Sequence, residues 1–244
     1  MKKNKITIIT SFFILTFSFQ SIAALKLDRT RIIYSENNSS VSLEIKNENK
    51  DSPYLAQSWL EDKDGRMLEN YIAAVPPLVR VNPDEKLVVR LEKLSDASSL
   101  PKDRETLFYY VLREIPPKAE EKNTLQLALQ TKIKLFYRPA SLGVKKSNKD
   151  FYQGIKILKS NESFKINNTT PYYVVMLAVV DLSVKKVMKN IKPITLAPFQ
   201  MVSVNINSAI PGRLGLLFID DFGGRPLVNY NCSASCNFEK ISDQ

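Results

Sequence analysis

The chain has 244 residues, with 35 Lys and Arg against 25 Asp and Glu, and its formal net charge is +10 at pH 7. It contains no histidine, which excludes Ser-His and Cys-His nucleophile systems and most zinc and copper sites. The lysines are scattered among acidic residues and no nucleic-acid-binding motif occurs. We therefore expect a protein that is not an enzyme, with no metal, no cofactor and no nucleic acid partner.

The first 23 residues are typical of a secretory signal peptide. Three lysines precede an apolar run from Ile6 to about Phe19, and the small residues Ser21 and Ala23 follow it. The run is short for a membrane span of about 20 residues, so an uncleaved anchor is the weaker alternative. Cleavage after Ala23 would remove three lysines and no acidic residue, which lowers the formal net charge from +10 to +7.

Short alternating segments bounded by turns follow, and they predict β-strands. In VSLEIK, the apolar residues Val41, Leu43 and Ile45 alternate with polar ones. Similar segments are YLAQSWLED, PPLVRV, KLVVRLEKL and LFYYVLREI, and no window has a persuasive helical period. This spacing favours an antiparallel β-sandwich. Because immunoglobulin-type sandwiches bury a tryptophan, we expect the sole tryptophan, Trp59, to lie in the core.

The stretch LQLALQTKIKLFYRP, from Leu125 to Pro139, alternates for about twice the length of a typical strand. The common interpretation of such alternation is that one face packs on a core and the other meets water. An exposed strand with leucines is an aggregation hazard, unless the protein lends that strand to another chain. We therefore expect part of this apolar edge to project beyond its partner strands.

A polar segment, RPASLGVKKSNKD, interrupts the pattern after Tyr137 and reads as a linker. Strand-like segments then resume, namely GIKILKS, SFKIN, YYVVMLAVVDL, ITLAPFQMVSVNI, RLGLLFIDD and PLVNYNC. The segment DLSVKKVMKNIK fits either a strand or a loop. The length is best explained by an all-β fold of two sandwiches, residues 24–141 and 142–244, joined near residues 140–147.

Both cysteines, Cys232 and Cys236, lie near the C-terminal end of the sequence. Their spacing is not the C-x-x-C of a redox enzyme, and two thiols alone make a poor metal site. In an oxidising compartment they predict a local disulfide. The chain-entropy model gives roughly 2 kcal/mol for so small a loop, enough to hold a terminal strand.

Several segments also resemble a known family. LPKDRETLFYYVLREIPP, LDRTRIIY, PYLAQSWLE, LQTKIKLFYRP and DFGGRP are similar to the signature of periplasmic pilus chaperones, the PapD-like family. The resemblance implies two immunoglobulin-like domains in a boomerang arrangement. It also implies a periplasmic protein that binds and caps pilin and adhesin subunits by donating a strand, and delivers them to an outer-membrane usher.

The same resemblance implies a role for two cations. It places Arg31 and Lys134 in the cleft between the domains, where they would hold the C-terminal carboxylate of a subunit. A carboxylate accepts charge-assisted hydrogen bonds from both groups, and arginine presents a fork. Fixing the carboxylate would also set the register of strand pairing, which a one-residue slip inverts.

Further residues take roles from the resemblance. The subunit groove would be filled by Leu125, Leu127 and Leu129. An ionic network between the domains would consist of Glu105, Arg138 and Asp221. Val111 departs from the signature, which usually has asparagine there.

Two other functions compete with this interpretation. A pilin or adhesin subunit would usually have one domain with a cysteine pair inside it, and LKLDRTR is a poor N-terminal donor extension. The second alternative is a secreted β-sandwich enzyme or carbohydrate binder. The sequence does not support it, because it has no histidine and no acidic catalytic constellation that can be placed. Self-association of the free chaperone through its own exposed strands is a further hypothesis.

Overall fold

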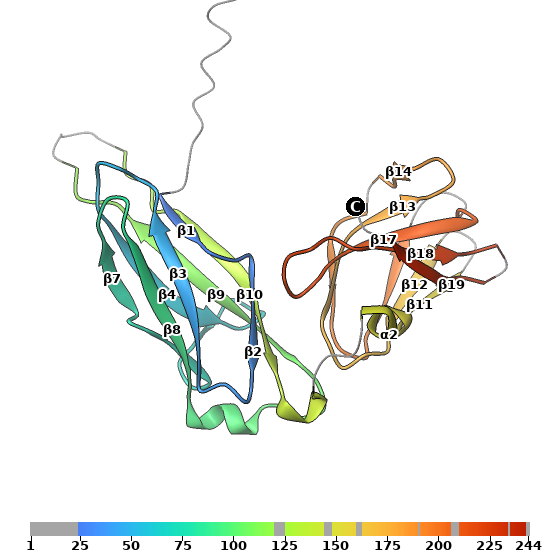
Figure 1. Cartoon of the computed structure of the whole chain (residues 1–244), viewed down its shortest axis with the longest axis horizontal. Coiled ribbons are helices and arrows are strands. Elements are labelled where there is room, and N and C mark those ends of the chain that lie inside the picture. The colour runs from blue at the N-terminus through green and yellow to red at the C-terminus, as the bar shows by residue number, and fades with distance from the viewer. Residues whose placement is uncertain are drawn as a thin grey trace, which may run out of the picture.

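The computed structural model of the chain describes residues 24–119, 125–143, 148–159, 163–189, 191–205, 210–233 and 235–242. The predicted signal peptide, residues 1–23, lies outside these ranges. No helix within them is long and apolar enough to cross a membrane. The described residues form two β-sandwich domains, which lie side by side and splay apart from their connection (Figure 1).

Two sheets enclose the core of the N-terminal domain. One has the strand order β1-β3-β8-β6, and the other has the order β2-β10-β9-β4-β5, with β7 also pairing with β4. β2 and β10 are parallel, whereas the other strand pairs of this domain are antiparallel. The strands are β1 (Leu25–Leu27), β2 (Arg31–Ser35), β3 (Ser40–Asn47), β4 (Tyr54–Glu61), β5 (Met67–Leu68), β6 (Ile72–Val75), β7 (Leu78–Val81), β8 (Lys86–Lys93), β9 (Thr106–Ile115) and β10 (Gln130–Arg138).

The C-terminal domain has a second pair of sheets, with the orders β11-β12-β16 and β14-β13-β17-β18-β19. A short strand, β15, pairs with β13, and all strand pairs within the described part of this domain are antiparallel. The elements are α2 (Asn148–Gln153), β11 (Ile155–Lys159), β12 (Ser163–Asn168), β13 (Val174–Asp181), β14 (Lys186–Val187), β15 (Ile194–Leu196), β16 (Met201–Asn205), β17 (Arg213–Ile219), β18 (Leu227–Asn231) and β19 (Asn237–Ser242).

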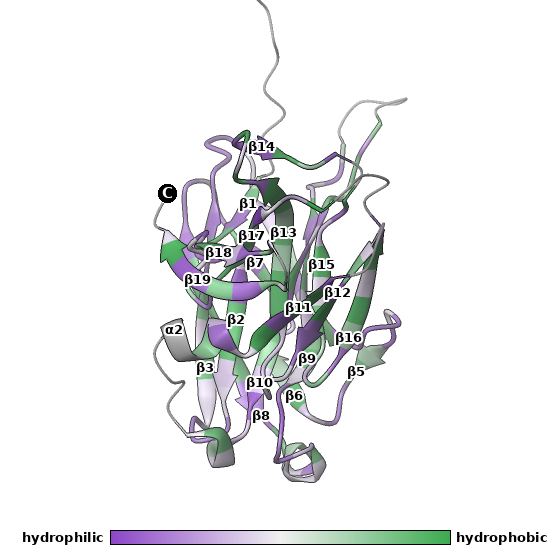
Figure 2. Ribbon diagram, turned by 90° about the vertical axis from the view of Figure 1, so that its right-hand side faces the viewer, coloured by the Kyte–Doolittle hydropathy of each residue, from purple (hydrophilic) through white to green (hydrophobic). Residues whose placement is uncertain are grey.

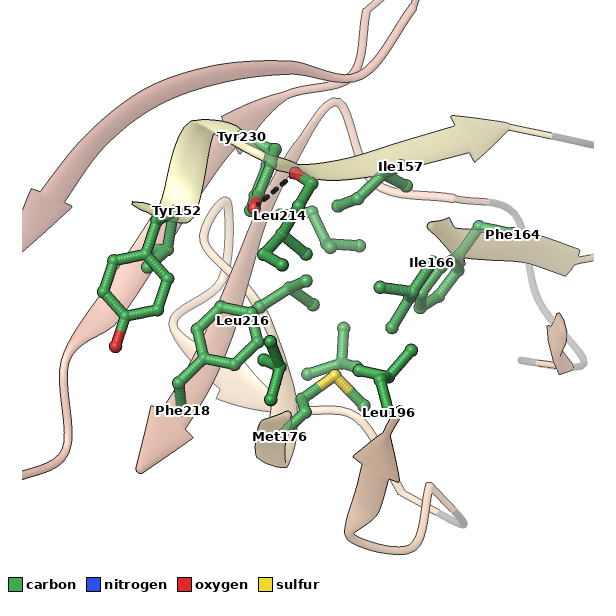
Figure 3. Close-up of a cluster of buried hydrophobic side chains, with 14 of the residues drawn as sticks. Tyr152, Ile157, Phe164, Ile166, Met176, Leu196, Leu214, Leu216, Phe218 and Tyr230 are labelled. Carbon is green, nitrogen blue, oxygen red and sulfur yellow. Dashed lines mark hydrogen bonds between the residues drawn. The ribbon is translucent and has the colours of Figure 1, made fainter. Parts of the chain in front are cut away.

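Each domain has its own hydrophobic core, which the alternating sequence pattern produces. Leu43 and Ile45 of β3 are fully buried, while the polar residues between them face outward, because successive side chains of a strand point to opposite faces. The alternation of hydrophobic and hydrophilic residues is visible along the strands (Figure 2). In the second core, the Tyr230 hydroxyl donates a hydrogen bond to the Ile155 carbonyl, 3.0 Å away (Figure 3). The expectation of two immunoglobulin-like sandwiches is confirmed.

Trp59 does not lie in the core, and the expectation for it was wrong. In β4 the buried residues are Ala56, Ser58 and Leu60, so Trp59 falls on the opposite parity and is only half-buried on the outer face. Its indole N–H donates to Glu61, and the Arg113 guanidinium lies over its ring at 4.9 Å. The polar end of the ring and this cation stabilise an outward position.

The long alternating stretch is not one strand throughout. β10 begins at Gln130, and residues 125–129 lie outside any strand. Just before β10 begins, one backbone hydrogen bond to β9 remains, from the Glu114 N–H to the Leu129 carbonyl. The neighbouring strand β9 ends at Ile115, and two prolines follow that have no N–H to donate. Loss of the partner strand therefore leaves the leucines projecting beyond the sheet.

Three further expectations can be compared with the structure. The predicted linker contains a 3₁₀ turn and the beginning of helix α2, while residues 144–147 lie outside the described ranges. Among the described residues of the ambiguous segment after β13, only Lys186–Val187 forms a strand. The Cys232–Cys236 disulfide is present and closes the connection between β18 and β19, as expected.

Candidate functional site

An ion-pair network crosses from one domain to the other. Arg138, the last residue of β10, lies 2.7 Å from the Glu105 carboxylate and 3.0 Å from Asp221 of the C-terminal domain. The Glu105 carboxylate also accepts a hydrogen bond from the backbone N–H of Tyr173 at 2.7 Å. The backbone N–H of Glu105 donates to the Pro171 carbonyl. One arginine and one glutamate therefore bind both domains at their junction.

Burial governs the electrostatics of this network. Glu105 is almost fully buried, and this desolvation raises its pKa in spite of the attraction of Arg138. Burial alone would lower the pKa of Arg138, but the attraction of Glu105 and Asp221 outweighs it and raises that pKa. The arginine is thus held as a cation, and each charge in the network depends on the others.

Arg31 and Lys134 form the second charged pair between the domains. They are direct partners where the parallel strands β2 and β10 begin to pair. Both face away from the N-terminal core, because their neighbours Ile32 and Leu135 are fully buried in it. Both side chains are half-buried on the surface that faces the C-terminal domain, where Arg31 lies 3.5 Å from the Ile219 carbonyl.

Neither cation has a carboxylate partner within ion-pair distance among the described residues. Burial lowers the pKa of Lys134, and the charge of Arg31 lowers it further. Burial also lowers the pKa of Arg31, despite the opposing attraction of Asp220 and Asp221. The Arg31 Nε is buried without a hydrogen-bond partner. Two partly desolvated like charges are therefore adjacent, which favours binding of an anion.

The free edge of β10 begins beside these two cations. On one side β10 pairs with β9 from Gln130 to Tyr137, but on the other side β2 starts only at Lys134. In the described part of the chain, no strand pairs with this edge before Lys134. Preceding it are three leucines, whose exposed fractions fall from 81% at Leu125 to 66% at Leu127 and 44% at Leu129.

Aromatic rings also take part in contacts between the domains that were not predicted from the sequence. The Phe136 and Tyr173 rings lie 5.7 Å apart between their centroids, and the Arg104 guanidinium lies 5.2 Å from the centroid of the Phe199 ring. Phe136 interrupts the polar parity of β10 and could have been noticed for that reason. No local pattern connects Arg104 with Phe199, because the pair is formed only when the domains meet.

Metal chemistry has no site among the described residues. These residues contain no group of three or more Cys, Asp and Glu side chains that could hold a metal ion. Positive charge and an unpaired strand edge are the features that the N-terminal domain presents beside the junction.

Two family models match the chain, one on each sandwich. The model of the pili and flagellar-assembly chaperone PapD N-terminal domain matches residues 24–143, and that of the pili assembly chaperone PapD C-terminal domain matches residues 151–230. The chain belongs to the pili assembly chaperone family. Arg31, Lys134 and the three leucines of this chaperone all lie in the N-terminal match, and Asp221 lies in the C-terminal one.

Individual relatives agree with the family assignment. The chaperone is 40% identical over 220 residues to PapD of Escherichia coli, and the match covers 89% of this chain and 91% of PapD. The solved structure of the YadV chaperone has a TM-score of 0.70 and 29% identity, and covers 86% of this chain and 100% of its own. A chain of the Salmonella enterica SafA pilin–SafB chaperone complex has a TM-score of 0.73 and 25% identity. This match covers 86% of the present chain and 97% of the chain in the complex.

Proposed function

We propose that this chain is a periplasmic chaperone that binds and caps pilus subunits by donating a strand, and hands them to an outer-membrane usher. The observation that carries the proposal is the free edge of β10, which lies between three exposed leucines and the unpaired cations Arg31 and Lys134. The family assignment supports the class of partner. The predicted signal peptide and the disulfide support an oxidising periplasm as the compartment.

The free edge also determines the direction of the bound strand. A strand added before Lys134 occupies the line that β2 continues, because both pair with the same edge of β10. If the added strand runs parallel to β10, its C-terminus meets Arg31, and a carboxylate lies between two cations. An antiparallel strand would bring an amino group there and would be repelled. The subunit strand therefore runs parallel to β10 and ends at Arg31.

The exposed leucines supply the apolar part of the complex. Full burial of a leucine contributes about 1.5–3 kcal/mol, and main-chain hydrogen bonds along the strand add affinity without sequence specificity. Anchoring the carboxylate at Arg31 and Lys134 fixes which leucine enters which part of the groove. The same edge could pair two free chaperones, so self-association remains a prediction for sedimentation analysis of the protein without subunits.

The test is a periplasmic pull-down of the tagged protein with co-expressed candidate pilins. The parent is compared with an Arg31→Ala/Lys134→Ala variant, and the matched control is Arg66→Ala/Lys86→Ala, which removes the same charge from exposed sites in the same domain. We expect pilins with the parent and the control, and roughly tenfold or greater loss with the site variant, since a hydrogen bond to a charged group contributes about 1.5–3 kcal/mol.

Other results have distinct meanings. Pilins bound equally by the parent and the site variant would leave the chaperone function standing and contradict the carboxylate anchor. If no pilin copurifies with the parent while a verified chaperone of the same system captures it, the proposed function is wrong.

A further inference from the structure

A pocket of about 580 Å³ lies beside Arg31, where the two domains face each other. The N-terminal domain contributes residues 28–31 and Ile33, and the C-terminal domain contributes residues 221–223 from the turn between β17 and β18. This turn reaches toward the N-terminal domain (Figure 1), and Gly223 approaches the Thr30 hydroxyl so closely that an added Cβ would lie 3.4 Å from it. The pocket therefore exists only in the assembled two-domain chain.

Phe222 is the most exposed large apolar residue of the described chain, with 98% of its surface in solvent. Its turn is well ordered, because the Asp220 carboxylate accepts the N–H groups of Phe222 and Gly224 at 2.9 and 2.7 Å. Gly223 has φ of +88°, and a Cβ on Gly224 would lie 2.5 Å from the Asp220 carboxylate. These hydrogen bonds hold the backbone of Phe222 in place beside the pocket, while its ring remains exposed.

The charges around the pocket leave one cation available. Asp28 is paired with Arg29 at 2.5 Å, and Asp221 is paired with Arg138. Arg31, in contrast, has a buried Nε without a partner. The pocket consequently combines an available guanidinium with an exposed aromatic ring and the aliphatic side chain of Ile33.

This combination matches the two groups of a C-terminal amino acid residue. Its carboxylate and its side chain are attached to the same Cα, so a carboxylate held by Arg31 places the side chain within a few ångströms of the pocket. Apolar side chains and aromatic pairs gain most from contact with such a ring.

We propose that this pocket receives the side chain of the subunit's last residue, and that Phe222 selects a large apolar, above all aromatic, side chain there. The inference rests on the proposed function, since it takes the carboxylate at Arg31 as its starting point. The chaperone then reads two features of a subunit end, its charge and its last side chain. Phe222 is a specificity residue that contacts the bound chain.

The experiment measures fluorescence anisotropy of labelled peptides with the two-domain protein purified from the periplasm. The peptides share an alternating Val-Thr sequence and end in Phe, Leu, Ser or Asp with a free carboxylate, or in Phe with an amide. The variants are Phe222→Ala and Phe222→Leu. The matched control is Val184→Ala, which truncates another exposed apolar side chain of the C-terminal domain that does not line the pocket.

We expect the parent and Val184→Ala to bind the Phe-ended peptide about tenfold more tightly than the Ser-ended one. Phe222→Ala is expected to reduce this ratio to about one, while Phe222→Leu retains part of it. Thermal melting of Phe222→Ala should match the parent, because the ring makes almost no contact in the free protein.

Three negative outcomes separate the inference from the proposed function. If the parent binds carboxylate peptides more tightly than the amide but shows no preference for the last side chain, the anchor stands and the pocket proposal is overturned. A preference that survives in Phe222→Ala also overturns it. If the amide binds as tightly as the carboxylate, the anchor in the proposed function fails as well.

Discussion

Lys134 and Arg138 lie on the same face of the same strand, yet their surroundings are opposite. Arg138 is within 3.0 Å of two carboxylates, one from each domain. Lys134 has no carboxylate partner among the described residues and instead adjoins the charge of Arg31. Arg138 thus links the two domains through ion pairs, whereas Lys134 has no ion-pair partner in the part of the chain that the structure describes.

The largest expected effect comes from removing the paired cation. Arg138→Met leaves the Glu105 carboxylate buried without its ion pair, and loss of one member of a buried pair destabilises by about 3–5 kcal/mol. Urea unfolding of the variant and the parent measures this loss. Glu105→Gln in the Arg138→Met background should recover part of it. A loss below about 1 kcal/mol would show that the network contributes little to the fold.

The next effect distinguishes the two ends of the alternating stretch. Leu135→Ala in the core is expected to lower the free energy of unfolding by about 2–5 kcal/mol. Leu127→Ala, at the same parity but 66% exposed, should change it by about 0.5 kcal/mol or less and still weaken pilin capture. Urea unfolding and the pull-down are measured on both variants. If Leu127→Ala melts like Leu135→Ala, Leu127 belongs to the core.

The smallest effect concerns the unpaired cation and depends on pH. The pKa of Lys134 is lowered in the folded state, so at neutral pH its charged form destabilises the free protein, and this penalty disappears as the pH rises through the folded pKa toward 10.5. Lys134→Met should therefore raise the free energy of unfolding at pH 7, by less than about 1 kcal/mol.

The difference between variant and parent is followed by urea unfolding from pH 7 to pH 10.5, where it should shrink. Lys156→Met, at an exposed position of β11, is the control and should give no such difference. A lower free energy of unfolding for Lys134→Met at pH 7 would contradict the interpretation that the Lys134 charge is unfavourable in the free protein and available to bind an anion.

Prediction from the sequence worked best where a residue's environment follows from its neighbours in the chain. The alternation around Leu43 and Ile45 predicts their burial, because a strand places every second residue on one face. Prediction did less well for Trp59. Its residue type suggested a core position, but its place in the alternation of β4 puts the ring on the outer face of the sheet. The strand expected from Leu125 begins only at Gln130, because its partner β9 turns away at two prolines.

The sequence by itself determined the two-sandwich fold and the disulfide, and its family resemblance singled out the charged residues of the junction. Only the tertiary structure decided how these charges divide into paired and unpaired ones. Arg138 reaches Asp221 across 83 residues of chain, while Arg31 adjoins Lys134, and neither of these two has an ion-pair partner among the described residues. It also decided that Phe222 stands exposed beside Arg31. Local patterns specify which face of a strand a side chain occupies, but contacts between domains depend on how the two finished sandwiches meet.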